Sequence, residues 1–254
     1  RARVDLPYMS ELTGKDEETL VKELEGIIFF NIGSAAEPSK LYVTADEYLS
    51  GNVREKLNMA KVAAATFLDG RYDVNVKALE AVQPKDLSAS EISVRLGATW
   101  LPPEIVQRFV FELLETPRYM QWNMKVHFSP YTAEWNIEGK SSDRGNVKAY
   151  NTYGTNRANA YKIIEETLNL KDIRIFDYVE DADGKRTPVL NKKETMLAQA
   201  KQEQIKAAFG DWIWQEPERR NLLVRMYNDK FNAIRPREYD GSHITFVGMN
   251  PAIE

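Results

Sequence analysis

The N-terminal part of the chain carries two helix-like patterns of apolar residues, followed by two strand-like runs. Residues 7–12 and 17–25 place apolar side chains on one helical face, and a glycine turn separates them. The runs 27–32 and 41–44 are rich in apolar, β-branched and aromatic residues and predict the two strands of a hairpin. Two helices followed by a hairpin is the element order of a winged helix, so we expect a winged-helix-like unit over 7–44.

A similar order recurs farther along the chain. Residues 88–96 open with the capping box S-x-x-E and predict a helix, and a second helix follows two prolines and ends near 114. The segments 124–128 and 133–137 predict a second hairpin. The sequence therefore predicts a second winged-helix-like unit over 88–137.

The other segments predict helices and one strand. Helical patterns cover 49–68, 74–82, 157–168, 193–214 and the residues after Pro217, and a strand-like run covers 173–179. The inner face of the long helix is expected to carry Leu197, Ala200, Ala208 and Trp212. We expect an α+β fold, mainly helical, with two winged-helix-like units plus a helical C-terminal segment. Borders near 84 and 154 give the domains 1–84, 85–154 and 155–254.

Composition excludes several kinds of site. The 254 residues are 43% hydrophobic and 28% charged, with a formal net charge of −4. The chain has no cysteine and two histidines, His127 and His243, which excludes disulfides and thiol catalysis and disfavours a histidine-rich metal site. No apolar run approaches the ~18 residues of a membrane span and no signal peptide is visible, so we expect a cytoplasmic chain without a membrane partner. Because it starts at Arg1 without methionine and stops at Glu254 without a polar tail or helix cap, we expect an internal piece of a larger protein.

Three short motifs resemble parts of catalytic signatures but lack the residues that the chemistry needs. Gly-Lys-Ser at 139–141 would end a phosphate loop, but Glu134 occupies the position of the required glycine. Asp-Glu at 46–47 lacks the rest of a helicase acidic box, and Pro-Pro at 102–103 lacks the flanking residues of an adenine methyltransferase tetrapeptide. We therefore predict no catalytic residue, no metal site and no cofactor, and expect that this segment is not an enzyme.

Charge and aromatic residues gather in one segment, 117–162. It holds seven Lys or Arg, Lys162 among them, against three Asp or Glu. The candidate nucleic-acid-binding residues are Arg118, Lys125, Lys140, Arg144, Lys148 and Arg157. Interleaved aromatic residues are Tyr119, Trp122, Phe128, Tyr131, Trp135, Tyr150 and Tyr153. Basic groups neutralise phosphates and aromatic faces stack on bases, which favours contact with nucleic acid. The alternative is that most of these rings form the core of the hairpin.

The predicted helix over 17–25 has the opposite character. Its solvent side carries Lys22 among the acidic residues Glu17, Glu18, Glu23 and Glu25. Phosphates would repel this face, so it is unsuited to reading a major groove. We expect this winged-helix-like unit to act as a protein–protein spacer.

Several phrases of the sequence occur together in one known kind of protein. They are VDLPYMSELTG from Val4, YLSGNVREKL from Tyr48, RLGATWLP from Arg95, YGTNRANAY from Tyr153, YNDKFN from Tyr227 and YDGSH from Tyr239. In combination they resemble the very large proteins of conjugative transposons and phages that join an adenine-specific DNA methyltransferase domain to a Swi/Snf-like superfamily-two helicase domain. The resemblance covers essentially the whole chain and implies a position between the two enzymatic domains, just before the helicase. None of that family's catalytic motif positions is present.

Residues and resemblance together favour a non-catalytic, DNA-engaging linker module of a bacterial mobile-element protein. Such a module would position duplex DNA or a displaced strand, with DNA and the flanking methyltransferase and helicase domains of the same chain as partners. The alternative is a protein-interaction scaffold that orients the flanking domains and touches no DNA.

Overall fold

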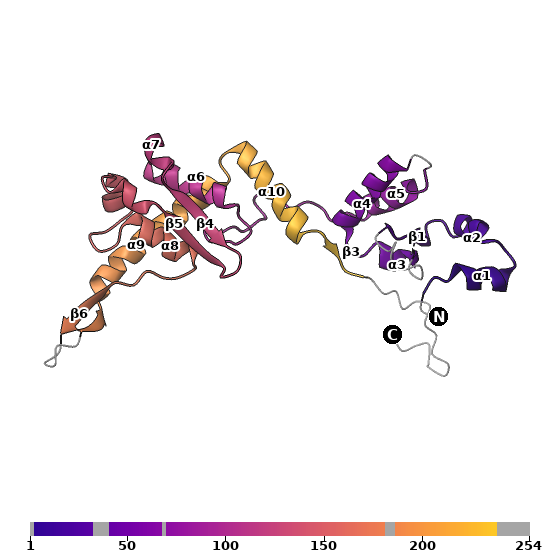
Figure 1. The fold of residues 1–254 in the computed structure, drawn as a ribbon, viewed down its shortest axis with the longest axis horizontal. Helices are drawn as coiled ribbons and strands as arrows, with labels where there is room; N and C mark the ends of the chain where they lie inside the picture. The colour runs from indigo at the N-terminus through magenta and orange to yellow at the C-terminus, as the bar shows by residue number, and fades with distance from the viewer. Residues whose placement is uncertain (1–2, 33–40, 68–69, 181–185, 238–254) are drawn as a thin grey trace, which may run out of the picture. The chain divides into compact units, whose positions relative to one another are not determined.

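The computed structural model describes residues 3–32, 41–67, 70–180 and 186–237 (Figure 1). The chain divides into two compact units. Unit 1 comprises Arg1–Leu87 and Asn228–Glu254, and unit 2 comprises Ser88–Tyr227. Helices predominate, and the strands of the described residues form two-stranded sheets, in agreement with the predicted α+β, mainly helical class. No helix within the described ranges has the length and apolar character needed to cross a membrane.

Unit 1 begins with two short helices. Asp16 caps the second of them by accepting a hydrogen bond from the backbone N–H of Thr19 at 2.8 Å. Gly14 ends the first helix in the left-handed conformation, with φ of 71°. The elements of unit 1 are α1 (Leu6–Thr13), α2 (Glu17–Glu23), β1 (Ile28–Phe30), β2 (Tyr42–Thr44), α3 (Ala45–Tyr48), β3 (Gly51–Asn52), α4 (Val53–Thr66), α5 (Asp73–Ala81) and β8 (Ile234–Arg235).

The first predicted hairpin is confirmed, because β1 pairs antiparallel with β2. Successive side chains of a strand point to opposite faces. Ile28 accordingly packs in a small core with Leu6 of α1 and Leu20 of α2. Phe29 belongs to a second core with α3, α4 and α5, where its ring stacks on Tyr48 with centroids 5.0 Å apart. The hairpin thus holds the two helical layers of unit 1 together.

The last described residues also belong to unit 1, although they are far from it in sequence. β8 pairs with β3. The buried side chain of Asn228 donates to the carbonyl oxygen of Leu87 at 2.9 Å and accepts from the N–H of the same residue at 2.8 Å. The expected segment 155–254 is therefore divided between the two units.

Unit 2 is built around the second predicted hairpin, which is confirmed with Val126 opposite Ile137. Helix α8 lies deepest in its core, and the side chains of Tyr161 and Ile164 are fully buried. Ala149 shares this core, so the border expected near 154 falls inside the unit. The elements are α6 (Pro103–Leu114), α7 (Arg118–Gln121), β4 (Lys125–Ser129), β5 (Glu134–Glu138), the short helices η3 (Lys140–Asp143) and η4 (Lys148–Thr152), α8 (Ala160–Leu168), β6 (Phe176–Glu180), β7 (Arg186–Leu190), α9 (Lys192–Ile213) and α10 (Pro217–Phe231). The last turn of α10, from Asn228 on, belongs to unit 1.

The predicted helix over 88–96 is wrong. The N–H of Ser88 does donate to the carboxylate of Glu91 at 2.8 Å, as a capping box requires, but the chain continues in turns and irregular backbone. Serine, isoleucine and valine make up most of this stretch and are weak helix formers, and Leu96 is buried in the core of unit 2 without a helix around it. The segment 88–137 therefore lacks the first helix of a winged helix, and a second unit of that kind is not confirmed.

The predicted inner face of the long helix, now α9, is wrong in part: Trp212 packs against the core of unit 2 as expected, but Ala200 is exposed. Leu197, expected inside, is 49% exposed. The buried face instead carries Thr195, Ala198, Gln202, Ile205, Phe209 and Ile213. Two polar residues lie on this face because they bond the extended backbone before β6: the hydroxyl of Thr195 accepts from Ile175 N–H at 3.0 Å, and the amide of Gln202 accepts from Ile173 N–H at 3.2 Å.

Several boundaries differ from the sequence pattern; for example, the helix expected over 49–68 is α4 at Val53–Thr66. Helix α8 begins three residues later than expected, because Asn159 caps it by accepting from Lys162 N–H at 3.0 Å. The strand expected over 173–179 begins at Phe176 and pairs with β7, which was not predicted.

Candidate nucleic-acid interface

A loop between β5 and α8 carries several of the predicted basic residues. It begins at Gly139, which has φ of +70°. A Cβ at this position would lie 2.8 Å from the carbonyl carbon of Asn123 and would overlap its carbonyl oxygen, so only glycine fits. This close approach fixes Lys140, the next residue, beside the segment that joins α7 to β4.

A buried polar network anchors the same loop. Asp143, 2% exposed, accepts hydrogen bonds from the hydroxyl of Tyr161 and, at 2.7 Å, from the side-chain amide of Asn146. The amide of Asn146 also donates to the carbonyl oxygen of Leu114 at 2.8 Å. Burial, with the bond to Asp143 as a second cause, raises the pKa of Tyr161 well above its ordinary value. The phenol therefore stays protonated and holds the loop between α6 and α8.

This loop and the first turn of α8 line an open groove with a volume of about 540 Å³. Its basic lining residues are Lys140, Arg144, Arg157 and Lys162. Glu165 and Glu166 lie at the same groove, so the lining carries four positive and two negative side chains. The N-terminal end of α8 lies there as well and adds a partial positive charge. The groove therefore favours a polyanion over a cation.

The four cations differ in how they are held. Lys140 is ion-paired with Glu165. Arg157 pairs with Asp177 at 2.7 Å and donates to the carbonyl oxygen of Phe176 at 2.9 Å, and its hydrogen bond is the first cause that holds the pKa of Asp177 below its ordinary value. Within the described ranges, Arg144 and Lys162 form no ion pair.

The structure brings together three of the six sequence-predicted candidates and leaves three elsewhere. Lys148 forms an ion pair with Glu115 at 2.6 Å, at the end of α6. Lys125 is exposed on β4 opposite Glu138, and Arg118 is exposed on α7. None of these three lines the groove.

The groove also contains Lys162, which is absent from the six candidates. Its signal in the sequence is Asn159, a helix N-cap that places Lys162 in the first turn of α8. That turn follows directly on the basic loop, so recognising the cap would have added Lys162 to the candidates.

The aromatic residues of the basic segment divide between core and surface. Trp135 is buried and packs against Phe128 with ring centroids 4.8 Å apart, and Tyr150 and Tyr153 also pack on the core. By contrast, Tyr119, Trp122 and Tyr131 are exposed. The alternative that these rings form core therefore holds for most of them, while three are exposed and their contact with nucleic acid stays a prediction.

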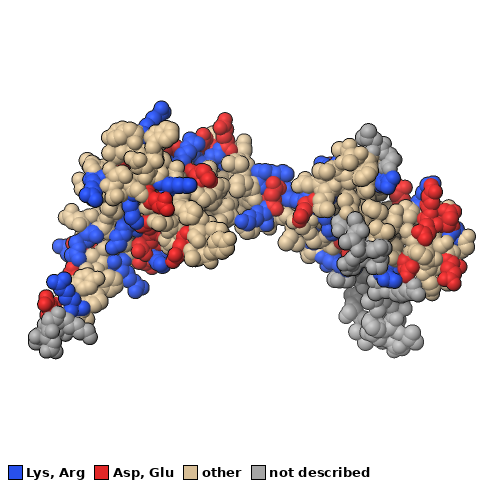
Figure 2. Space-filling model, viewed as in Figure 1, with Lys and Arg blue, Asp and Glu red and all other residues tan. Residues whose placement is uncertain are grey.

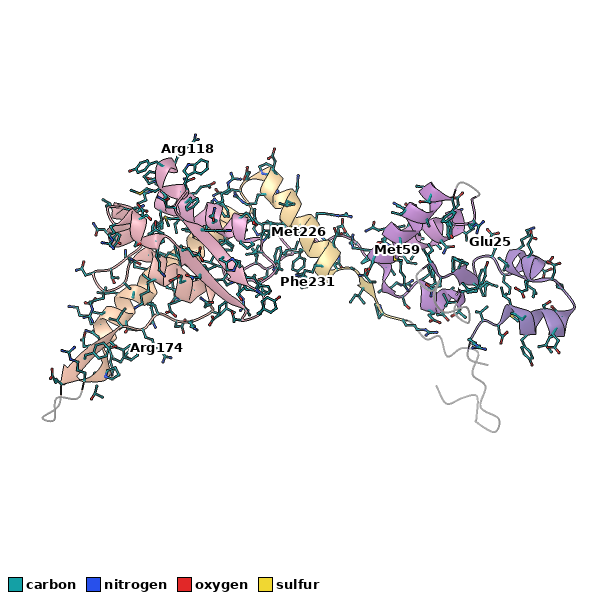
Figure 3. All side chains as sticks on the ribbon, viewed as in Figure 1. Glu25, Met59, Arg118, Arg174, Met226 and Phe231 are labelled. Carbon is teal, nitrogen blue, oxygen red and sulfur yellow. The ribbon has the colours of Figure 1, made fainter. Side chains whose placement is uncertain are left out.

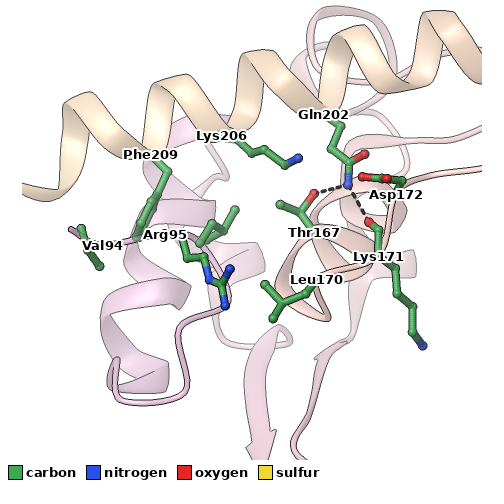
Figure 4. Close-up of a pocket in the computed structure, with 10 residues that line it drawn as sticks. Val94, Arg95, Thr167, Leu170, Lys171, Asp172, Gln202, Lys206 and Phe209 are labelled. Carbon is green, nitrogen blue, oxygen red and sulfur yellow. Dashed lines mark hydrogen bonds between the residues drawn. The ribbon is translucent and has the colours of Figure 1, made fainter.

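A second hollow, of about 350 Å³, lies between α8, α9 and the segment before α6 (Figure 4). Arg95, Lys171 and Lys206 are among its lining residues. Its buried amide, Gln202, already donates to the hydroxyl of Thr167 at 3.0 Å and to the carbonyl oxygen of Lys171 at 2.8 Å. The side-chain N–H groups of Gln202 are therefore already used in hydrogen bonds within the fold. Among the described residues, no three acidic or histidine side chains cluster as a metal ion would require.

In unit 1, helix α2 presents an acidic surface (Figure 2). Glu17 and Glu18 occupy its first turn, where the helix dipole favours negative charge. Lys22 pairs with Glu18 at 2.9 Å and offsets one negative charge, but the helix carries three glutamates and one lysine and so remains net negative. This surface would repel phosphates.

Comparison with known proteins gives two family matches, while no curated protein and no solved structure matches the chain. Residues 1–37 match the family described as "Probable helicase, winged helix domain". This match supports a helicase-associated region with a winged helix, as the order of α1, α2 and β1 predicted. Residues 95–233 match the family described as "Domain of unknown function (DUF8437)", which spans nearly all of unit 2. Because this match covers more than half of the chain, the protein belongs to the DUF8437 family.

Proposed function

We propose that the chain is a non-catalytic, DNA-engaging module of a helicase-containing protein, and that unit 2 contacts the phosphate backbone. The observation that carries the proposal is the groove in which Lys140, Arg144, Arg157 and Lys162 meet. The helicase winged-helix match at residues 1–37 supports the association with a helicase.

The ion pairs at the groove give its cations different roles. Arg144 and Lys162 are available to neutralise phosphates directly, because no described carboxylate pairs with them. Lys140 and Arg157 are held in place by Glu165 and Asp177, so they present charge in fixed positions with less freedom to lose on binding. Contacts of this kind position a nucleic acid without reading its sequence. We expect non-specific binding with a dissociation constant of about 10⁻⁴ to 10⁻⁶ M.

The finer proposal concerns the place of the module in the full protein. The resemblance described above suggests a linker between an adenine-specific methyltransferase domain and a helicase domain, where bound DNA would be handed from one to the other. The alternative is a protein-interaction scaffold without DNA contact. The acidic surface of α2 favours this second role for unit 1.

A salt titration of the whole chain with labelled DNA tests the proposal. Each neutralised phosphate contributes about −0.9 to the slope of log K against log salt on duplex DNA. Two to four phosphates give a slope of about −1.8 to −3.6, or an affinity loss of about 12- to 150-fold between 50 and 200 mM salt.

The decisive variant combines Arg144→Glu with Lys162→Glu. It should weaken binding at low salt and make the slope shallower by about 1.8, since two phosphate contacts are lost. The matched control, Lys22→Glu with Lys77→Glu, makes the same change of charge on exposed positions of unit 1 and should bind as the parent does. If the parent shows no salt-dependent binding, or the groove variant binds like the parent, the DNA-engaging role is rejected in favour of the scaffold.

A further inference from the structure

Helix α7 carries two large aromatic side chains that are exposed to solvent. Tyr119 is 71% exposed and Trp122, at its C-terminal end, is 90% exposed. Burying a side chain of this size is strongly favourable, so an exposed pair on one turn calls for an explanation. Figure 3 shows the labelled Arg118 of the same helix pointing away from the body of unit 2.

The local structure keeps these rings outside. Residues three apart lie on the same side of a helix, so Tyr119 and Trp122 are neighbours. The other side of α7 is anchored, because the side-chain amide of Gln121 donates to the carbonyl oxygen of Thr116 at 2.8 Å. Turning the rings inward would break this bond and move Met120, which is partly buried.

The aromatic pair adjoins the basic loop. Trp122 precedes Asn123, whose carbonyl group lies against Gly139, and Lys140 follows Gly139 directly. Just before α7 in the chain, Glu115 forms an ion pair at 2.6 Å with Lys148 of the same loop. The segment 115–123, which carries the exposed rings, therefore contacts the basic loop at Gly139 and at Lys148.

We infer that Tyr119 and Trp122 form a stacking platform for unpaired bases, which makes single-stranded nucleic acid the preferred ligand of unit 2. The inference rests on the proposed function, because the groove must hold the phosphates of the same strand. In a duplex the faces of the bases are already stacked on one another, whereas in a single strand they are free to stack on protein rings. Arg118, beside the rings, adds positive charge that a protein ligand with an apolar surface would not need.

The test measures binding of three labelled ligands by the whole chain: an oligothymidylate, an abasic strand with the same number of phosphates, and a duplex. Tyr119→Ala with Trp122→Ala should weaken oligothymidylate binding by about 5- to 150-fold, the loss expected for one stacked base. Binding of the abasic strand and the salt slope should not change. Tyr119→Phe with Trp122→Phe should restore most of the affinity, because phenylalanine also stacks. Tyr131→Ala, which removes a 99% exposed ring elsewhere, serves as the control and should bind like the parent.

The outcomes separate this inference from the proposed function. If the alanine pair binds oligothymidylate like the parent while the Arg144→Glu and Lys162→Glu variant loses binding, the platform is rejected and the groove stands. Equal losses for oligothymidylate and the abasic strand would mean that α7 acts on the fold and not on bases, which also rejects the platform. If the parent binds none of the three ligands, both ideas fail.

Discussion

Replacing Gly139 by alanine tests the close approach on which the basic loop depends. An L-residue in the left-handed region costs about 1–2 kcal/mol. The added Cβ would also lie 2.8 Å from the carbonyl carbon of Asn123 and overlap the oxygen, and forcing an atom into such a contact costs about 1–3 kcal/mol. Both atoms that the added Cβ would meet belong to the backbone of Asn123, so the backbone would have to shift to make room. We expect Gly139→Ala to lower the free energy of unfolding of unit 2 by about 2–5 kcal/mol.

The chain supplies both the reporter and the control for this experiment. All five tryptophans lie in unit 2, so their fluorescence during urea unfolding of the whole chain reports on that unit. The matched control is Gly145→Ala in the same loop, where a Cβ would meet no atom within 4 Å. Its free energy of unfolding should stay within about 1 kcal/mol of that of the parent. A small increase is expected if alanine lowers the conformational entropy of the unfolded chain. Equal urea midpoints for the two variants would refute the argument that Gly139 is packed against Asn123.

Two further predictions concern α9 and the ion pair at the groove. Ile205→Ala should lower the free energy of unfolding by about 2–5 kcal/mol, because Ile205 is fully buried, whereas Leu197→Ala on the exposed face should cost far less; the same fluorescence titration decides. Arg157→Gln should raise the pKa of Asp177 towards its ordinary value, because the hydrogen bond from Arg157 is the first cause of the lowered pKa. A carboxyl whose pKa is lower in the folded state than in the unfolded state stabilises the fold at neutral pH, and this stabilisation is lost as the pH falls through the folded-state pKa. The decrease in the free energy of unfolding on acidification should therefore be smaller in the variant. NMR titration of the Asp177 carboxyl measures the shift, and an unchanged pKa would contradict the assignment.

Signals that are local in sequence predicted the elements of this fold well. The cap at Asp16 and the turn at Gly14 depend on residues a few positions apart, and each of the runs β1 and β2 is recognised from its own residues. Such signals are physical, since an N-cap or a glycine turn satisfies backbone groups within its own turn. The same holds for the hairpin of β4 and β5.

Features that depend on distant partners could not be predicted in this way. The buried face of α9 includes Thr195 and Gln202, which an apolar pattern assigns to solvent, because their partners are backbone groups of Ile173 and Ile175. Asn228 and Leu87 bond each other across 141 positions, so no local window assigns the end of the chain to unit 1. The groove is a similar case, because Lys140 and Lys162 meet only after the loop has folded over α8.

The distribution of charge decides where a nucleic acid should be sought in this protein. The family match at residues 1–37 names a winged helix. In a helix-turn-helix the second helix reads the major groove, but α2 carries Glu17 and Glu18 in its first turn. A phosphate near that turn would meet two negative charges, and the favourable helix dipole is already used by the same carboxylates. At the groove of unit 2 the balance is reversed, because four cations meet two carboxylates beside the N-terminal end of α8. Electrostatics dominates non-specific binding, so the proposed contact with nucleic acid belongs to unit 2 and not to the winged helix.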